Sequence, residues 1–189
     1  MSKLIFLDTE TTGVDTDRCG MFQIAGSIDI DGKEVDNFNY FCDIFPEDLI
    51  VPEALEINKV TEKKIHSFVP PVRAFNLFQG KMAKYVDKYD KKDKFIVVAY
   101  IADFDNRVLR RWFKMNGDSY FGSWFWVPWI DVAVLAAYTY QDRRSEIENF
   151  KQGTLAKFMG IKFDDNSLHD SQYDLGILKQ IYYKLAEGD

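Results

Sequence analysis

Apolar residues recur along the chain with two different periods, and the order of those periods predicts a mixed α/β fold. Short apolar or alternating runs, typical of strands, come first, and helical spacing alternates with further strands after residue 50. The Asp31-Gly32 pair between the second and third runs predicts a hairpin. The predicted strands are Lys3–Leu7, Met21–Ile30, Val35–Phe45, Phe95–Tyr100 and Trp124–Ile130.

Helical periodicity fills most of the remaining chain, broken at Pro70-Pro71 and by a charge-rich connection over 87–94. Three leading antiparallel strands, followed by parallel strands that alternate with helices, indicate a mixed α/β sheet flanked by helices. We expect one domain over residues 1–189. The predicted helices are Pro52–Ile65 in two pieces, Val72–Tyr89, Asp105–Met115, Val132–Tyr140, Gly153–Met159 and Asp174–Ala186.

Composition places the chain among ordinary globular proteins. Apolar residues make up 47% of it, which excludes disorder of the whole chain. No apolar run reaches the ~18 residues of a membrane span, and the first residues lack a signal-peptide cleavage site. The two cysteines, Cys19 and Cys42, make no disulfide framework. We therefore expect a cytoplasmic protein that does not associate with a membrane.

The net charge of −6 argues against a protein that coats nucleic acid by bulk charge. It does not argue against an enzyme whose acids gather around metal ions, because bound cations reverse the local sign. Aromatic residues are frequent, at 16%. A large aromatic core explains this composition, and so would platforms on which bases stack, for which Trp124 and Trp126 are candidates.

Acidic residues follow the ends of predicted elements at three places. In LIFLDTETTG, a two-residue offset puts Asp8 and Glu10 on one face of an extended chain. Two such carboxylates repel each other unless a raised pKa or a divalent cation compensates, and oxygen ligands suit Mg²⁺ or Mn²⁺. Asp105 follows the fourth predicted strand, where it could equally cap a helix. His169 and Asp174 precede and open the last helix.

Taken together, the three motifs are specific where each alone is weak. Their order, D-x-E, then Asp after a strand, then H-x4-D, resembles the DnaQ-like exonucleases, the DEDDh group of the ribonuclease H-like superfamily. The resemblance runs from Ile5 to about Leu178 and is strongest in LDTETTG. The chain departs from the family at Tyr100-Ile101, where His-Asn is common, at Asn58, where His is common, and at Ser171, where Ala is common.

The resemblance implies a ribonuclease H-like fold and a 3′–5′ exonuclease that releases nucleoside monophosphates. It implies two Mg²⁺ or Mn²⁺ ions, with His169 as the general base and Asp131 as a supporting acid. The implied metal ligands are Asp8, Glu10, Asp105 and Asp174.

The expected partner is single-stranded or 3′-terminal nucleic acid. Its candidate contacts lie after the first acids, in the segment between the first two motifs, and on a basic helix face. Phe22 could instead belong to the core, and the face of Arg107, Arg110, Arg111 and Lys114 could simply be solvated. The candidate substrate-binding residues are Thr11, Thr12, Gly13, Phe22, Asn58 and Arg107.

Other functions remain open at this point. The chain could be a catalytically silent nucleic-acid-binding or polymerase-associated module, although nothing physical would then require all the acids and His169. A structural domain with chance acids would not explain three ordered motifs. A polymerase or a second copy of the chain is a candidate partner. The choice between DNA and RNA depends on contacts to the 2′-hydroxyl, and no motif in the sequence predicts such a contact.

Overall fold

The computed structural model describes residues 2–164 and 171–187. Over these residues the strands form one five-stranded sheet in the order β3-β2-β1-β4-β5. The pairs β1–β2 and β2–β3 are antiparallel, whereas β1–β4 and β4–β5 are parallel, as the sequence predicted. The strands are β1 Lys3–Thr11, β2 Met21–Ile30, β3 Lys33–Phe41, β4 Ile96–Ala99 and β5 Ile130–Asp131.

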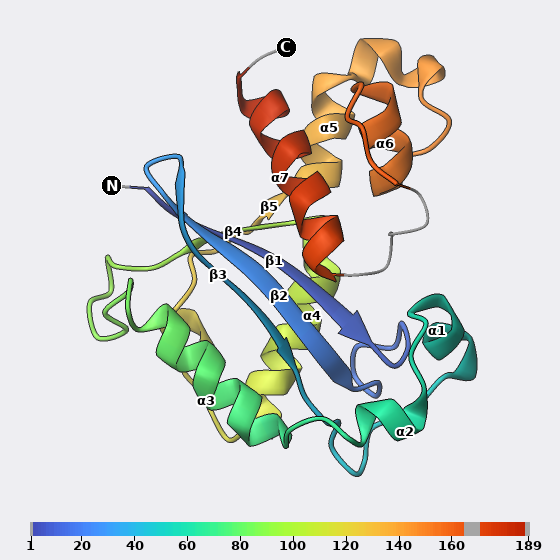
Figure 1. The fold of residues 1–189 in the computed structure, drawn as a ribbon. Coiled ribbons are helices and arrows are strands. Elements are labelled where there is room, and N and C mark those ends of the chain that lie inside the picture. Colours follow the sequence, from blue (N-terminus) through green and yellow to red (C-terminus); the bar gives the residue numbers. More distant parts are fainter. Residues whose placement is uncertain (1, 165–170, 188–189) are drawn as a thin grey trace.

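Helices cover both faces of this sheet (Figure 1). α3 and α4 lie on one face, and α5, α6 and α7 lie on the other, while α1 and α2 lie beside the arrowhead of β1. Within the described ranges, no helix combines the length and the apolar character needed to cross a membrane. The helices are α1 Pro52–Ile57, α2 Glu62–Ile65, α3 Pro71–Met82, α4 Ala102–Met115, α5 Val132–Thr139, α6 Gln152–Phe158 and α7 Ser171–Glu187, with 3₁₀ turns at Phe121–Ser123 and Gln141–Glu146.

β1 is buried on both of its faces. Ile5 and Leu7 pack against the helices α3 and α4, while Leu4 and Phe6 pack against α5, α6 and α7. Successive side chains of a strand point to opposite faces, so this alternation fixes the direction of every later side chain on β1. Its register therefore decides where the acids that follow must point.

Several predicted boundaries were wrong, and the structure supplies the reasons. The predicted strand Trp124–Ile130 reduces to β5, because Pro128 has no N–H to donate to a ladder. Residue Phe125 makes only an isolated bridge with Phe95. α3 ends at Met82 rather than Tyr89, because the chain then turns to meet the start of β1. Both α4 and α7 begin three residues earlier than predicted.

An ion pair with a buried aspartate fastens α7 to the sheet. The ammonium group of Lys179 donates to Ser27 and lies 2.8 Å from the Asp29 carboxylate on β2. Tyr183, one turn further along α7, donates a hydrogen bond of 2.6 Å to the same carboxylate. Asp29 is buried, so its charge depends on these partners. The network fixes α7 against β2, and with it the residues at the start of the helix.

A second ion pair with a buried carboxylate involves the helix face predicted to be basic. Arg111 on α4 pairs with Asp48, whose side chain is only 1% exposed, and its guanidinium also donates to the carbonyl of Asp17. Arg107, one turn earlier, pairs instead with Asp103 at 2.9 Å, where both side chains are exposed. Two arginines of one helix thus differ in function, because only Arg111 neutralises a buried carboxylate.

We expect Arg111→Met to lower the free energy of unfolding by about 3 kcal/mol, because it leaves the Asp48 charge buried without its cation. Arg107→Met on the same helix removes an exposed pair and should cost at most about 1 kcal/mol. Urea denaturation of both variants tests the difference. Equal losses in the two variants would show that the Asp48 pair is no more important than a surface pair.

Candidate active site

The first two acids project from the end of β1 toward α7. β1 stays extended through Thr11, so Asp8 and Glu10 continue the face of Leu4 and Phe6. Both carboxylates are partly exposed at the end of the strand. The pairing with β2 shifts register between Glu10 and Thr11, so the regular ladder ends directly after these acids.

The third acid reaches the same place from the opposite face. Thr9 points away from Asp8 and Glu10, toward α4, and donates a hydrogen bond of 2.7 Å to Asp105. Asp105 lies in the first turn of α4 and is buried. The residue that caps α4 is Ile101. The alternative that Asp105 serves as the helix cap is therefore wrong.

A strained turn brings α4 this close to β4. Ile101 adopts φ 56° and ψ 57°, a left-handed conformation that is unfavourable for a β-branched residue. Asp131 holds the turn by accepting a hydrogen bond of 2.9 Å from the N–H of Ala102. The other oxygen of Asp131 caps α5 through the N–H of Ala133. Asp131 thus ties the first turns of both helices, a supporting function consistent with the family resemblance.

The fourth acid enters from α7. Ser171 is fully buried, and its hydroxyl donates a long hydrogen bond of 3.4 Å to Glu10. Asp174 lies one turn further, in the first turn of α7, and lines the same cavity as Asp8 and Glu10. The proposed base, His169, lies outside the described residues, so its role stays a prediction from the sequence.

Crowding of these acids shifts their protonation. Burial raises the pKa of Asp8 well above its usual value, and the charges of Asp105, Glu10 and Asp174 raise it further. Burial likewise raises the pKa of Asp105 to about 7, against the hydrogen bond from Thr9. In the absence of a cation the folded protein therefore holds its acids against both desolvation and mutual repulsion.

The donor set fits divalent cations. Carboxylate oxygens are the ligands that Mg²⁺ and Mn²⁺ prefer, and a bound cation would relieve the repulsion that raises the pKa of Asp8. Among the described residues, however, no three His, Cys, Asp or Glu side chains are already arranged to hold a metal ion. The acids are neighbours without forming a finished coordination shell.

Asp8, Glu10 and Asp174 line a cavity of about 540 Å³. The same cavity is lined by Lys151, Gln152 and Lys157, at and within α6. Gln152 donates a hydrogen bond of 2.6 Å to the backbone carbonyl of Asp174, which joins α6 to α7 beside the acids. The sequence analysis did not single out these residues, because two lysines on a short helix carry no motif. Only the packing of α6 on α7 brings these residues to the cavity that Asp8, Glu10 and Asp174 line.

The loop after the acids is held by its own residues. The hydroxyl of Thr12 is buried, donates to the carbonyl of Leu49 and accepts a hydrogen bond of 2.8 Å from the N–H of Gly20. A Cβ at Gly13 would lie 2.6 Å from the sulfur of Cys19, so only glycine fits there. Asn58 donates a hydrogen bond of 3.1 Å to the carbonyl of Thr11. The loop is therefore rigidly placed next to Glu10.

Two further candidates lie apart from the cavity lining. Phe22 is 2% exposed and packs with Ile44 and Ile65, which is the core position that the sequence also allowed. Arg107 is exposed on α4 and paired with Asp103. Their predicted contacts with substrate stay predictions.

Comparison with known proteins finds a likeness only at the level of structure. No family model matches the sequence, and no curated protein is similar to it. Escherichia coli exonuclease I in complex with a dT13 oligonucleotide superposes with a TM-score of 0.74 at 19% identity, covering 98% of this chain and 41% of that one. The zinc-bound form of the complex between the enzyme and single-stranded DNA gives 0.75 at 18% identity, covering 98% and 40%.

The chain has the ribonuclease H-like fold of exonuclease I. Another exonuclease I structure agrees, with a TM-score of 0.76 at 19% identity, covering 99% of this chain and 41% of that one. The fold expected from the three motifs is thereby confirmed. The chain spans about two fifths of the length of these structures. At this level of identity the likeness establishes the fold alone.

In the absence of divalent metal, we expect the free energy of unfolding to rise as the pH falls from about 8 to about 6. The pKa values of Asp8 and Asp105 are raised in the folded protein, whereas an unfolded aspartate titrates near ~3.9. The folded protein therefore binds protons in this range that the unfolded chain does not, by at most about 1.4 kcal/mol per pH unit and group. Thermal unfolding in EDTA measures the effect.

The matched variants are Asp8→Asn and Asp142→Asn. Asp8→Asn removes one crowded charge, so it should raise the unfolding midpoint at pH ~8 and flatten the pH dependence. Asp142 is exposed on the second 3₁₀ turn, and its amide variant should behave like the wild type. An unchanged slope in Asp8→Asn would contradict the inferred crowding.

Proposed function

We propose that the chain is a divalent-metal-dependent 3′–5′ exonuclease acting on single-stranded nucleic acid. The observation that carries the proposal is the meeting of Asp8, Glu10, Asp105 and Asp174 at one end of β1, in the fold of exonuclease I. Chance acids would have no reason to converge from a strand and two helices. The raised pKa of Asp8 reflects the cost of keeping them together, a cost that a function would explain.

The four carboxylates would hold two Mg²⁺ or Mn²⁺ ions, as the resemblance implies. Bound there, the ions would help to form the attacking hydroxide and would stabilise charge on both the attacking and the leaving oxygen. Asp8 is placed to serve both ions, because it is the acid whose pKa responds to Asp105, Glu10 and Asp174 together. A zinc-bound form is among the exonuclease I structures, which supports a divalent cation here.

The remaining residues would bind and orient the strand. Lys151 and Lys157 line the same cavity as the acids and would attract the phosphate backbone into it. The rigid Thr11–Gly13 loop, braced by Asn58, would contact the terminal sugar through its backbone. His169 would accept the proton of the attacking water. Exonuclease I forms complexes with dT13 and dA16 oligonucleotides, which supports a single strand as the substrate.

A catalytically silent module of the same fold is the alternative, bound to nucleic acid alone, to a polymerase or to a second copy of the chain. Such a module would gain stability by losing one of the crowded acids, because each raises the pKa of Asp8. The retention of four acids at this cost favours an enzyme.

We expect the protein with Mg²⁺ to release mononucleotides from a 5′-labelled single-stranded oligonucleotide, and EDTA to stop the reaction. A 3′-phosphate should block it, because the extra charge would meet the carboxylates. Asp174→Asn should abolish hydrolysis while the fold survives, because Asp174 lines the cavity as a proposed ligand. Matched DNA and RNA oligomers, with free and blocked 3′ ends, resolve product lengths and substrate preference.

The control is Asp142→Asn, which makes the same chemical change on the surface away from the cavity and should keep full activity. Cutting of a 3′-blocked or circular strand as fast as a free one would refute the 3′-end polarity. Full activity of Asp174→Asn would refute the ligand assignment.

His169→Ala should reduce the rate by roughly 10²–10⁴-fold, the usual contribution of a general base. The wild-type rate should rise with pH through the pKa of this residue, since only neutral imidazole accepts a proton, and the variant should lose that rise. His169→Gln should do little better, because an amide has no basic nitrogen. Rate profiles against pH, with metal affinity from calorimetry, separate the outcomes. Near-normal turnover would make His169 a bystander, and lost metal affinity would make it a ligand.

A further inference from the structure

The connection between α3 and β4 lies at the end of the sheet opposite to the acids. Lys3, the first residue of β1, pairs with Asp93 and donates a hydrogen bond to the carbonyl of Tyr85. Glu10 lies seven residues further along the same strand, a separation of about 23 Å at ~3.3 Å per residue. In Figure 1 this loop lies beyond the start of β1, away from its arrowhead. Whatever binds here does not touch the proposed catalytic acids.

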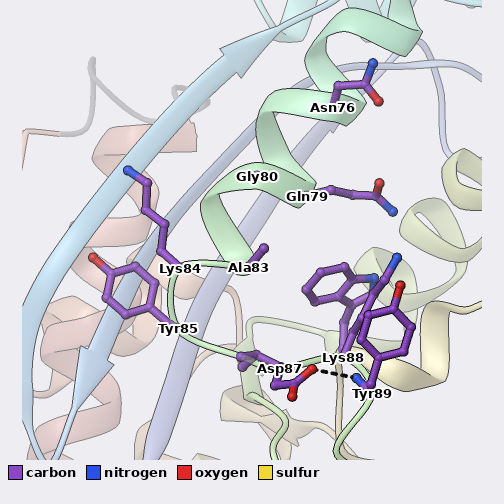
Figure 2. A pocket seen from close by; sticks show the side chains of 11 residues that line it. Asn76, Gln79, Gly80, Ala83, Lys84, Tyr85, Asp87, Lys88 and Tyr89 are labelled. Atoms are coloured by element: carbon purple, nitrogen blue, oxygen red, sulfur yellow. Dashed lines mark hydrogen bonds between the residues drawn. The ribbon is translucent and has the colours of Figure 1, made fainter.

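Two cavities meet in this connection. One, of about 640 Å³, runs along the end of α3 to Trp124, and the other, of about 450 Å³, reaches Lys91 and Tyr120. Both are lined by Lys88 and Tyr89, whose side chains lie side by side in Figure 2. A hydrogen bond of 3.0 Å from the N–H of Tyr89 to Asp87 holds the turn. The two hollows therefore form one continuous surface across a single lysine and tyrosine.

Large aromatic rings remain exposed on this surface and beside it. Tyr89 is 85% exposed and Tyr120 is 69% exposed, whereas the nearby rings of Trp124 and Phe125 are buried. Trp126, which is 40% exposed, adjoins the second hollow through Lys94, whose ammonium donates a hydrogen bond of 2.6 Å to the carbonyl of Gly122 beside Ser123. We call the whole the aromatic–lysine surface, made of Tyr89, Tyr120, Trp126, Lys88, Lys91 and Lys94.

Positive charge accompanies these rings in a chain that is acidic as a whole. Residues 84–94 hold five lysines against three aspartates, whereas the whole chain has a net charge of −6. Lys3 already neutralises Asp93, so the excess is larger than the local sequence suggests. The ammonium of Lys88 lies 5.5 Å from the ring centre of Tyr89, and that of Lys94 lies 5.1 Å from that of Trp126. Rings and cations are thus interleaved rather than segregated.

We propose that the aromatic–lysine surface is a second binding site for single-stranded nucleic acid, which rests on the proposed function in taking the same strand as ligand. Exposed rings stack on bases of any sequence, while lysines between them pair with phosphates. A protein partner fits less well, because lysine is depleted from the core of protein interfaces. The strand would thus be bound at both ends of the sheet, with its 3′ end at the acids and an upstream stretch here.

Geometry sets a minimum length for this double contact. About 23 Å of strand β1 corresponds to about seven nucleotides at ~3.4 Å per stacked nucleotide. An extended strand covers the same distance with fewer nucleotides, but a trinucleotide is too short to reach both sites in any conformation. The surface should therefore increase affinity for long strands and leave very short ones unaffected.

The test uses dT3 and dT30 as probes. In the Asp174→Asn background, which would bind without cutting, Tyr89→Ala/Tyr120→Ala should weaken dT30 binding about tenfold or more. Lys88→Gln/Lys91→Gln should reduce the salt dependence of dT30 binding, lowering its log–log slope by roughly 1.4. Neither double variant should change dT3 affinity, nor dT3 hydrolysis with Asp174 restored. The control is Tyr138→Ala on α5, since Tyr138 is 72% exposed and lies outside the surface.

The outcomes separate this proposal from the proposed function. Loss of dT30 affinity in the tyrosine variant but not in Tyr138→Ala supports the surface, even in a protein that fails to hydrolyse either oligomer. Unchanged dT30 affinity overturns it, even if dT3 is hydrolysed. Equal weakening of dT3 and dT30 also overturns it, because the effect would then be exerted at the acids. A dimer in analytical ultracentrifugation that the tyrosine variant dissociates overturns it in favour of a protein interface.

Discussion

The two-residue repeat of β1 is the constraint on which the rest of the structure depends. A slip of one residue would turn Leu4 and Phe6 toward α3 and α4, where Ile5 and Leu7 now pack, and would turn the acids that follow to the wrong face of the sheet. The same repeat turns Asp8 and Glu10 toward α7 and Thr9 toward Asp105. Core packing therefore fixes the positions of the carboxylates without any residue devoted to that purpose. The site begins at the end of the strand, directly after its alternating buried residues.

Crowded acids must be held by elements that do not yield to their repulsion. Lys179 fastens α7 to β2, and Asp131 pins the first turn of α4 through the N–H of Ala102. The strained backbone of Ile101 also restrains α4, because it lets the helix begin directly after β4. Without these ties, each helix could relax outward and separate its acid from Asp8. Burial first, and then the charges of the neighbouring acids, raise the pKa of Asp8 at the position that these ties maintain.

The sequence predicted those features that depend on local pattern or on ordered motifs. The mixed sheet, the acids of β1 and the helices that carry Asp105 and Asp174 all followed from periodicity and from the three motifs. Lys151 and Lys157 did not, since their relation to the acids arises from the packing of α6 on α7. The predicted strand over the aromatic segment before β5 was wrong for a different reason. Its apolar residues suggest a strand, yet some rings are buried in a turn while others stay exposed.

Charge explains why binding and chemistry would be divided between separate surfaces. A cluster of four carboxylates suits cations but repels the phosphates of a nucleic acid, so it cannot supply affinity for a strand by itself. Affinity must then come from residues set away from the acids. In the proposed function, Lys151 and Lys157 would attract phosphates at the rim of the cavity. Lys88 and Lys91 of the aromatic–lysine surface would do so at the far end of β1. Because physiological salt screens charges over such a distance, the carboxylates at one end of the sheet and the lysines at the other do not neutralise each other. The protein can therefore have an acidic site and a basic surface at the same time.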